Sequence, residues 1–144
     1  MPVILLIVLL IAPVSTLGKS PQRTKKPKTL TGTYTLKLRN RAGGTLLVHQ
    51  LSPTRIEFDL ECNRGAPSYN MGMAHGTMDV NDGIAVYRVT EFNGPCEIRF
   101  DFRASVVNIK QNGDDFACGF GHGVDCGGAY RLVSHKPPKF KKRD

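Results

Sequence analysis

The amino-acid sequence predicts an all-β domain: a single antiparallel barrel, or a sandwich, of about eight strands in meander order, with two disulfides. Between Thr29 and Ser134, apolar and polar residues alternate in short runs, which is the period of half-buried strands. Gly, Asn, Asp and Pro separate these runs at the spacing typical of all-β domains. The four cysteines are an even number, which favours a disulfide framework.

The first expected strand covers 33–39, where Tyr34, Leu36 and Leu38 share one face, and the turn 42–44 follows it. The second expected strand covers 46–51 and has two candidate buried faces. These faces are Leu46 with Val48, or Leu47 with His49 and Leu51. The strand ends at 52–53 because a proline cannot continue the ladder of hydrogen bonds.

The third expected strand, over 55–62, shows one of the clearest alternations in the chain. Its apolar face consists of Ile56, Phe58, Leu60 and Cys62, and charged residues occupy the opposite face. A turn at 65–67 then leads to a fourth strand over 71–80. The orientation of the strand 55–62 toward the core therefore follows from the sequence alone.

The second half of the domain begins with a strong hairpin turn at 81–83, because Asn, Asp and Gly tolerate the positive φ that tight turns require. Strands are then expected over 84–90, 96–103, 106–110, 116–120 and 129–133. In the strand 96–103, the apolar face consists of Cys96, Ile98, Phe100 and Phe102. Closure into a barrel would remove the exposed strand edges that invite aggregation.

The positions of the cysteines among these strands favour one of the three formally possible pairings. Cys96 begins a strand and Cys118 lies two strands later, whereas Cys62 ends a strand and Cys126 precedes the last one. We therefore expect the disulfides Cys96–Cys118 and Cys62–Cys126. No metal site or other cofactor is expected, because the sequence lacks a Cys-x-x-Cys pair and its His residues are scattered.

The N-terminal residues indicate secretion. An apolar run over 3–12 precedes Pro13 and small residues that suit a signal-peptidase site, so we expect a signal peptide over 1–18. This run is too short to cross the membrane, and no later run approaches the roughly 18 apolar residues that a spanning helix needs. The mature protein is therefore expected to be secreted, extracellular and not transmembrane.

The net charge of +8 lies almost entirely in two segments beside the domain 29–134. Residues 19–28 and residues 135–144 each contain five Lys or Arg residues, with prolines among them. Such segments cannot bury apolar surface, so we expect a disordered basic N-terminal arm and a disordered basic C-terminal tail. They would either attach to acidic polysaccharide or an anionic surface, or serve solubility alone. Nucleic acid is not an expected partner, because aromatic residues are not interleaved with these charges.

The glycine-rich segment from Cys118 to Cys126 is the first candidate binding site. One interpretation is a rigid, disulfide-clamped loop that presents Phe120, His122 and Asp125 to a partner. The simpler interpretation is a tight connection between strands that needs positive φ at several positions.

A second candidate binding segment contains Ser68, Tyr69 and Asn70. The competing interpretation, which the residue types favour, makes Tyr69, Met71 and Met73 ordinary core residues. Catalysis finds little support, because no motif links the Ser, His and Asp residues that a nucleophilic triad would need. We therefore do not expect an enzyme.

Several short motifs occur in a fixed order between Leu30 and Leu132. They comprise Gly32 and Tyr34; Gly65, Pro67, Ser68, Asn70 and Gly72; Gly76 and Thr77; Cys96; Cys-Gly-Phe-Gly-x-Gly-Val at 118–124; and Gly128 and Tyr130. This order resembles a group of small secreted, mostly bacterial and uncharacterised β-barrel proteins, for which the element at 118–124 is the most specific. The chain is also loosely similar to periplasmic proteins of the lysozyme-inhibitor type.

The second resemblance implies a protein-binding role in which barrel loops plug an enzyme cleft. Together with the residues above, it leads us to expect a secreted, non-enzymatic binding protein, an inhibitor-like module that recognises a protein or a glycan through its barrel loops. The alternative is an extracellular matrix or structural protein that attaches to acidic polymers through its basic tails.

Overall fold

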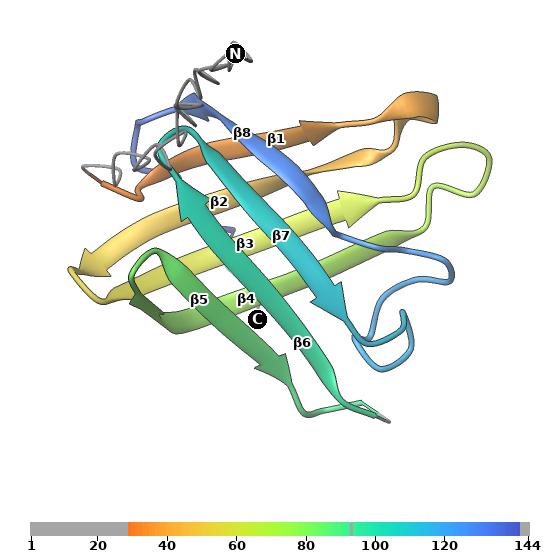
Figure 1. The fold of residues 1–144 in the computed structure, drawn as a ribbon. Helices are drawn as coiled ribbons and strands as arrows, with labels where there is room; N and C mark the ends of the chain where they lie inside the picture. The colour runs from red at the N-terminus through yellow and green to blue at the C-terminus, as the bar shows by residue number, and fades with distance from the viewer. Residues whose placement is uncertain (1–28, 93, 142–144) are drawn as a thin grey trace, which may run out of the picture.

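The computed structural model describes residues 29–92 and 94–141, and it forms a closed antiparallel barrel with the order β1-β2-β3-β4-β5-β6-β7-β8 (Figure 1). Each strand pairs with its neighbour in sequence, and β1 also pairs with β8 to close the barrel. The strands are β1 Gly32–Lys37, β2 Gly43–Ser52, β3 Arg55–Asn63, β4 Met71–Asn81, β5 Ile84–Val89, β6 Cys96–Arg103, β7 Val106–Asn112 and β8 Gly128–Ser134. The predicted all-β meander barrel is confirmed.

The barrel core consists of the residues that alternate inward along these strands. In β2, Leu46 and Val48 are fully buried, so the first of the two candidate faces is the correct one. Phe58 of β3 lies at the centre, with its ring 5.2 Å from that of Phe100 and 5.0 Å from that of Tyr87, both edge-on. Edge-to-face contacts of this kind add to the stabilisation that burial of the rings provides.

Each of two buried tyrosines donates a hydrogen bond from its hydroxyl to a main-chain carbonyl that precedes the tyrosine's own strand. The Tyr34 hydroxyl donates to the Leu30 carbonyl at 2.9 Å, and the Tyr130 hydroxyl donates to the Cys126 carbonyl at 3.0 Å. Burial disfavours the charged phenolate and raises the pKa of Tyr34 to about 12. It raises the pKa of Tyr130 as well. Both hydroxyls therefore remain hydrogen-bond donors at physiological pH.

The first turn differs from the prediction. The chain reverses through a short 3-10 segment, η1 Arg39–Arg41, in which Asn40 and Arg41 have positive φ. Gly43 and Gly44, expected in the turn, belong to β2 instead. Gly44 is needed there for packing, because a Cβ at this position would lie 2.6 Å from the Tyr130 hydroxyl oxygen. Leu38 leaves the strand and is exposed, contrary to the expected face.

The strand predicted over 116–120 is wrong. This segment forms consecutive turns, since the Cys118 amide donates to the Asp114 carbonyl and the Phe120 amide donates to the Asp115 carbonyl. The Asp114 side chain also accepts a hydrogen bond from the Ala117 amide at 2.7 Å. The alternation of apolar residues predicted a strand here, but main-chain amides bond to a nearby Asp side chain and not to a neighbouring strand. Local hydrogen bonding by aspartate thus outweighs the apolar pattern.

Both predicted disulfides are present, Cys62–Cys126 and Cys96–Cys118. They join the end of β3 and the start of β6 to the long connection between β7 and β8, residues 113–127. Disulfides are typical of proteins from an oxidising compartment. Nothing within 29–92 and 94–141 is a helix long and apolar enough to cross a membrane.

The predicted signal peptide at 1–18 and the predicted basic arm at 19–28 lie outside the described residues. Of the predicted basic tail at 135–144, the structure describes residues 135–141, which form neither strand nor helix. The Lys141 ammonium lies 3.1 Å from the Glu61 carboxylate on the outer side of β3. The disorder of both basic segments stays a prediction.

Candidate functional site

The connection between β7 and β8 closes one end of the barrel, and we call residues 113–127 the plug loop. It lies beside the loop between β3 and β4 (Figure 1), where the Gly121 amide donates to the Met71 carbonyl at 2.8 Å. Three of its apolar residues, Ala117, Phe120 and Val124, are buried. We call this end of the molecule the plugged end.

Phe120 is part of the core and is not presented to a partner, since its exposed fraction is only 7%. Its ring occupies the space beside Gly72 of β4, where an added Cβ would lie 2.8 Å from the Phe120 Cγ. The expectation that a partner contacts this ring is therefore corrected. The glycine at position 72 and the aromatic residue at position 120 are complementary parts of one packing contact.

Hydrogen bonds hold the tip of the plug loop to itself and to the loop between β3 and β4. The Asp115 carboxylate accepts hydrogen bonds from the Phe116 and Gly123 amides, and it lies 3.3 Å from the His122 Nδ1. The His122 carbonyl accepts hydrogen bonds from the Asn70 side chain at 2.8 Å and from the Arg64 guanidinium at 3.0 Å. These contacts cross between segments far apart in sequence and fix the tip in one position.

The two predicted binding segments therefore meet, but their residues have different roles. Asn70 positions the backbone of His122, whose own imidazole is 77% exposed. Ser68 and Tyr69 are exposed beside it. Asp125 is exposed, and its carboxylate accepts a hydrogen bond from the Gly127 amide at 2.7 Å. Of the six predicted binding residues, only Phe120 is excluded from the surface.

Large apolar side chains gather on the surface around the plug loop. We call this set the exposed rim; it consists of Leu38, Tyr69, Met71, Phe92 and Phe116. The Phe116 ring centre lies 6.1 Å from that of His122. The Phe92 ring lies over Gly119, where an added Cβ would be 2.2 Å from its Cε2 atom. Leu38 and Met71 line one groove of about 490 Å³.

The interpretation of Tyr69, Met71 and Met73 as core residues is wrong, because all three side chains are exposed. The buried positions of β4 alternate with these exposed ones, and the first of them, Gly72, has no room for a side chain because Phe120 and Val124 of the plug loop fill the space beside it. Sequence reasoning also missed Phe92 and Phe116 as surface residues. Their positions next to turns were a usable signal, since turns lie on the surface.

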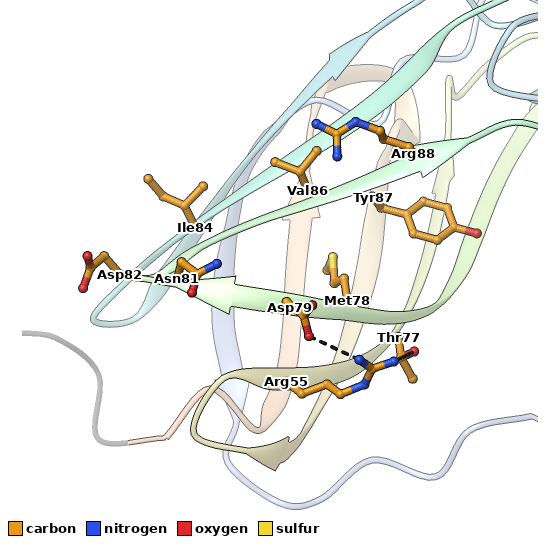
Figure 2. A pocket seen from close by; sticks show the side chains of 10 residues that line it. All are labelled: Arg55, Thr77, Met78, Asp79, Asn81, Asp82, Ile84, Val86, Tyr87 and Arg88. Atoms are coloured by element: carbon orange, nitrogen blue, oxygen red, sulfur yellow. Dashed lines mark hydrogen bonds and ion pairs between the residues drawn. The ribbon is translucent and has the colours of Figure 1, made fainter.

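A second hollow lies on the side of the barrel between β4 and β5 (Figure 2). It is an open groove of about 800 Å³, and residues of both strands line it together with Arg55 of β3. The Arg55 guanidinium lies 3.2 Å from the Asp79 carboxylate and donates to the Thr77 hydroxyl at 3.0 Å. No sequence motif marks this groove.

The described residues contain no group of three or more His, Cys, Asp or Glu side chains that could hold a metal ion. No family model, curated protein or solved structure matches the chain. The resemblance of the Cys118 to Val124 motif to small secreted bacterial proteins therefore stays a prediction, and so does the looser similarity to lysozyme inhibitors. The plugged end and the side groove are two places in the described part of the chain where the geometry supports binding.

We expect the tip of the plug loop to loosen in acid. The hydrogen bond from the Gly123 amide, followed by those from other amides and the nearby His122, holds the pKa of the Asp115 carboxyl below its ordinary value. A carboxyl whose pKa is lower in the folded protein than in the unfolded chain stabilises the folded protein at every pH above its unfolded pKa, which is near 4. This stabilisation is lost as the pH falls from that value through the lower pKa of the folded protein. Hydrogen exchange, corrected for the intrinsic rate, should show the Gly123 amide losing protection in that range.

The matched control for this pH effect is Asp125→Asn, which removes a carboxylate that bonds locally to Gly127. This variant should keep the acid-dependent loss of protection at Gly123. Asp115→Asn should instead weaken protection of Gly123 at neutral pH and flatten its dependence on pH. Unchanged protection of Gly123 from pH 7 to pH 2 in the unmodified protein would contradict the assigned role of Asp115.

Proposed function

We propose that this protein is a secreted, non-enzymatic binding protein that recognises an extracellular protein through its plugged end. The observation that carries the proposal is the exposed rim, in which aromatic and methionine side chains surround a disulfide-anchored loop. Side chains of these types are enriched at protein-binding surfaces, and buried aromatic anchors supply much of the energy of such interfaces.

The geometry of the plug loop favours binding because it is ordered before a partner arrives. Two disulfides attach the loop to β3 and β6, and hydrogen bonds from Asn70 and Arg64 hold the backbone at His122. A loop that is already ordered loses little conformational entropy on association, so more of the contact energy appears as affinity. The glycines around His122 also let a partner approach the main chain closely.

Polar groups at the plugged end would provide orientation. The exposed imidazole of His122 lies beside Phe116, and the exposed carboxylate of Asp125 follows in the same loop. Arg64 is also exposed at this end. Apolar anchors with polar groups around them are the usual composition of a standard protein interface.

The alternative function, attachment to acidic polymers through the basic tails, has less support from the described residues. The ammonium of Lys141 faces the carboxylate of Glu61 in the same chain, at 3.1 Å. Exposed ion pairs of this kind are weak. In the structure, however, the charge of Lys141 faces the barrel of its own chain and not an outside polymer. We therefore propose recognition at the plugged end, and variants of the tail serve as the control in the binding experiment.

The test compares capture of partners from extracellular material by the unmodified protein and by Phe116→Ala and Tyr69→Ala variants. Partners identified by mass spectrometry would then be purified and titrated. We expect the Phe116→Ala variant to bind about 30-fold more weakly, since a binding hot spot is worth about 2 kcal/mol or more. The variant should unfold at an unchanged temperature, because Phe116 is 67% exposed.

Two matched variants separate the alternatives. Val133→Ala removes an exposed apolar residue of β8 away from the rim and should leave capture intact. A Lys139→Ala/Lys141→Ala double variant should also retain capture, including at raised salt. Loss of capture in the tail variant, with no effect of Phe116→Ala, would favour the acidic-polymer function instead. Capture that disappears after glycosidase treatment of the extracellular material would identify a glycan ligand.

A further inference from the structure

The barrel has a short junction between β4 and β5. Their ladder consists of two residue pairs next to the hairpin turn, Val80 with Ala85 and Asn81 with Ile84. In contrast, β4 pairs with β3 from Met71 to Asp79, and β5 pairs with β6 as far as Val89. Beyond the two pairs, β4 and β5 separate, and the groove of about 800 Å³ opens between them (Figure 2). We call this opening the seam.

Main-chain groups of both strands point into the seam. The Val80 amide donates to the Thr54 carbonyl at 2.8 Å, so Val80 directs its main-chain groups toward the side of β3. Because successive residues of a strand point to opposite sides, the residues at odd positions point toward β5. These are His75, Thr77 and Asp79.

The same reasoning applies to the facing strand. Ile84 pairs with Asn81 across the two-residue turn, so its main-chain groups face β4. Those of Val86 and Arg88 therefore face the seam as well, while Ala85 and Tyr87 face β6. The described ladder provides no partner across the seam for His75, Thr77, Val86 or Arg88. Two strand edges thus present hydrogen-bonding groups to one groove.

One end of the β4 edge already accepts a main-chain partner. Met71 also occupies an odd position of β4, so its main-chain groups point to the same side of the strand as those of His75 and Thr77. Its carbonyl accepts a hydrogen bond from the Gly121 amide of the plug loop at 2.8 Å. The hairpin with β5 occupies the other end of this edge. Between these two contacts, Thr77 and Asp79 of β4 line the groove.

The inner side of the groove is closed by side chains. The Tyr87 ring packs edge-on against Phe58 at 5.0 Å, and it reaches Gly76 of β4, where an added Cβ would lie 3.4 Å from the ring. Met78, which also lines the groove, is buried. Because this floor seals the core, an occupant would lie along the strands and would not enter the barrel.

The charges around the groove do not select an anion or a cation. Arg55 pairs with Asp79 at 3.2 Å, and Arg88 pairs with Glu97 of β6 at 3.1 Å. Both cations that line the groove are thus paired with a neighbouring carboxylate. The features that remain for recognition are the two strand edges and the apolar floor formed by Tyr87 and Met78.

We propose that the seam between β4 and β5 binds an extended segment of a partner polypeptide as an added strand. The segment would pair its main chain with His75, Thr77 and Asp79 and would direct alternate side chains toward the floor at Tyr87. Addition of a strand to a free sheet edge is a recurrent mode of peptide recognition, in which main-chain hydrogen bonds provide affinity and alternate side chains provide specificity. This site is independent of the plugged end.

The test starts from the protein alone and then uses a displayed library of random ten-residue peptides as the probe. In the free protein, hydrogen exchange of the His75, Thr77, Val86 and Arg88 amides should be faster than that of amides in the β3–β4 ladder. The most enriched peptide should shift the NMR signals of these residues and slow the exchange of their amides. The same peptide with N-methyl groups at alternate residues, which lacks the donors, should bind at least about tenfold more weakly.

Several outcomes would overturn the proposal. These are slow exchange of the seam amides in the free protein, no enriched peptide, equal binding by the N-methylated peptide, or shifts confined to the plugged end. Shifts at the seam that depend on protein concentration alone would identify a second copy of this chain as the occupant. The Phe116→Ala variant should bind the peptide as well as the unmodified protein does, which separates this site from the proposed function.

Discussion

Replacing both Cys62 and Cys126 by alanine is expected to lower the free energy of unfolding by about 4 kcal/mol on the chain-entropy model. The bridge joins residues 64 positions apart, from the end of β3 to the residue that precedes β8 by two positions. Removing it frees a long segment of the unfolded chain, which gains conformational entropy. Denaturant unfolding of the oxidised variant, with mass spectrometry to verify that the Cys96–Cys118 bridge persists, measures the loss.

The matched control is the double replacement of Cys96 and Cys118, which are 22 residues apart. The shorter loop predicts a smaller loss of about 3 kcal/mol, since the entropy of closing a loop grows with its length. Both pairs are buried, so the losses of packing are similar in kind. A Cys62/Cys126 variant as stable as the unmodified protein would contradict the stabilisation that the chain-entropy model predicts for this bridge.

The replacement Phe58→Ala is expected to destabilise the barrel by about 3–5 kcal/mol, because it removes a fully buried ring and leaves a cavity. The cavity would adjoin Phe100 and Tyr87, both of which pack edge-on against Phe58. The loss should appear in denaturant unfolding. The near-ultraviolet circular dichroism of the folded variant should also change, since Tyr87 loses its neighbour.

Phe116→Ala is the matched control for this core replacement, because it deletes the same side chain from the surface. The exposed ring of Phe116 should contribute less than about 0.5 kcal/mol to stability. A similar loss in the two variants would mean that Phe116 is packed and not exposed. That result would also weaken the case for the exposed rim as a binding surface.

The seam and the plugged end would give the protein two binding surfaces with different chemistry. The plugged end offers side chains held by disulfides, while the seam offers main-chain groups of β4 and β5. An inhibitor-like partner contact at one surface and strand addition at the other would not compete directly. Binding measurements with both kinds of ligand present would show whether the two surfaces act independently.

The sequence by itself determined the features that depend on neighbouring residues. The alternation of Ile56, Phe58 and Leu60 with charged residues identified the buried face of β3, because successive side chains in a strand point to opposite sides. The turn 81–83 was also identified, and its Asp82 and Gly83 have the positive φ that such turns require. The pairing of both disulfides was also predicted correctly, although Cys118 lies in a series of turns and not in the strand expected there.

Only the tertiary structure decided which side chains the plug loop buries and which it leaves exposed. The loop inserts Phe120 beside Gly72 and leaves Phe116 on the surface, although both phenylalanines fit one apolar alternation. Gly72 is small because Phe120 and Val124 of the plug loop fill the space beside it, and the alternation of β4 places Met71 and Met73 on the outer face. The seam likewise depends on where β4 and β5 separate. Such features arise from contacts between distant segments, which the local period of a sequence does not encode.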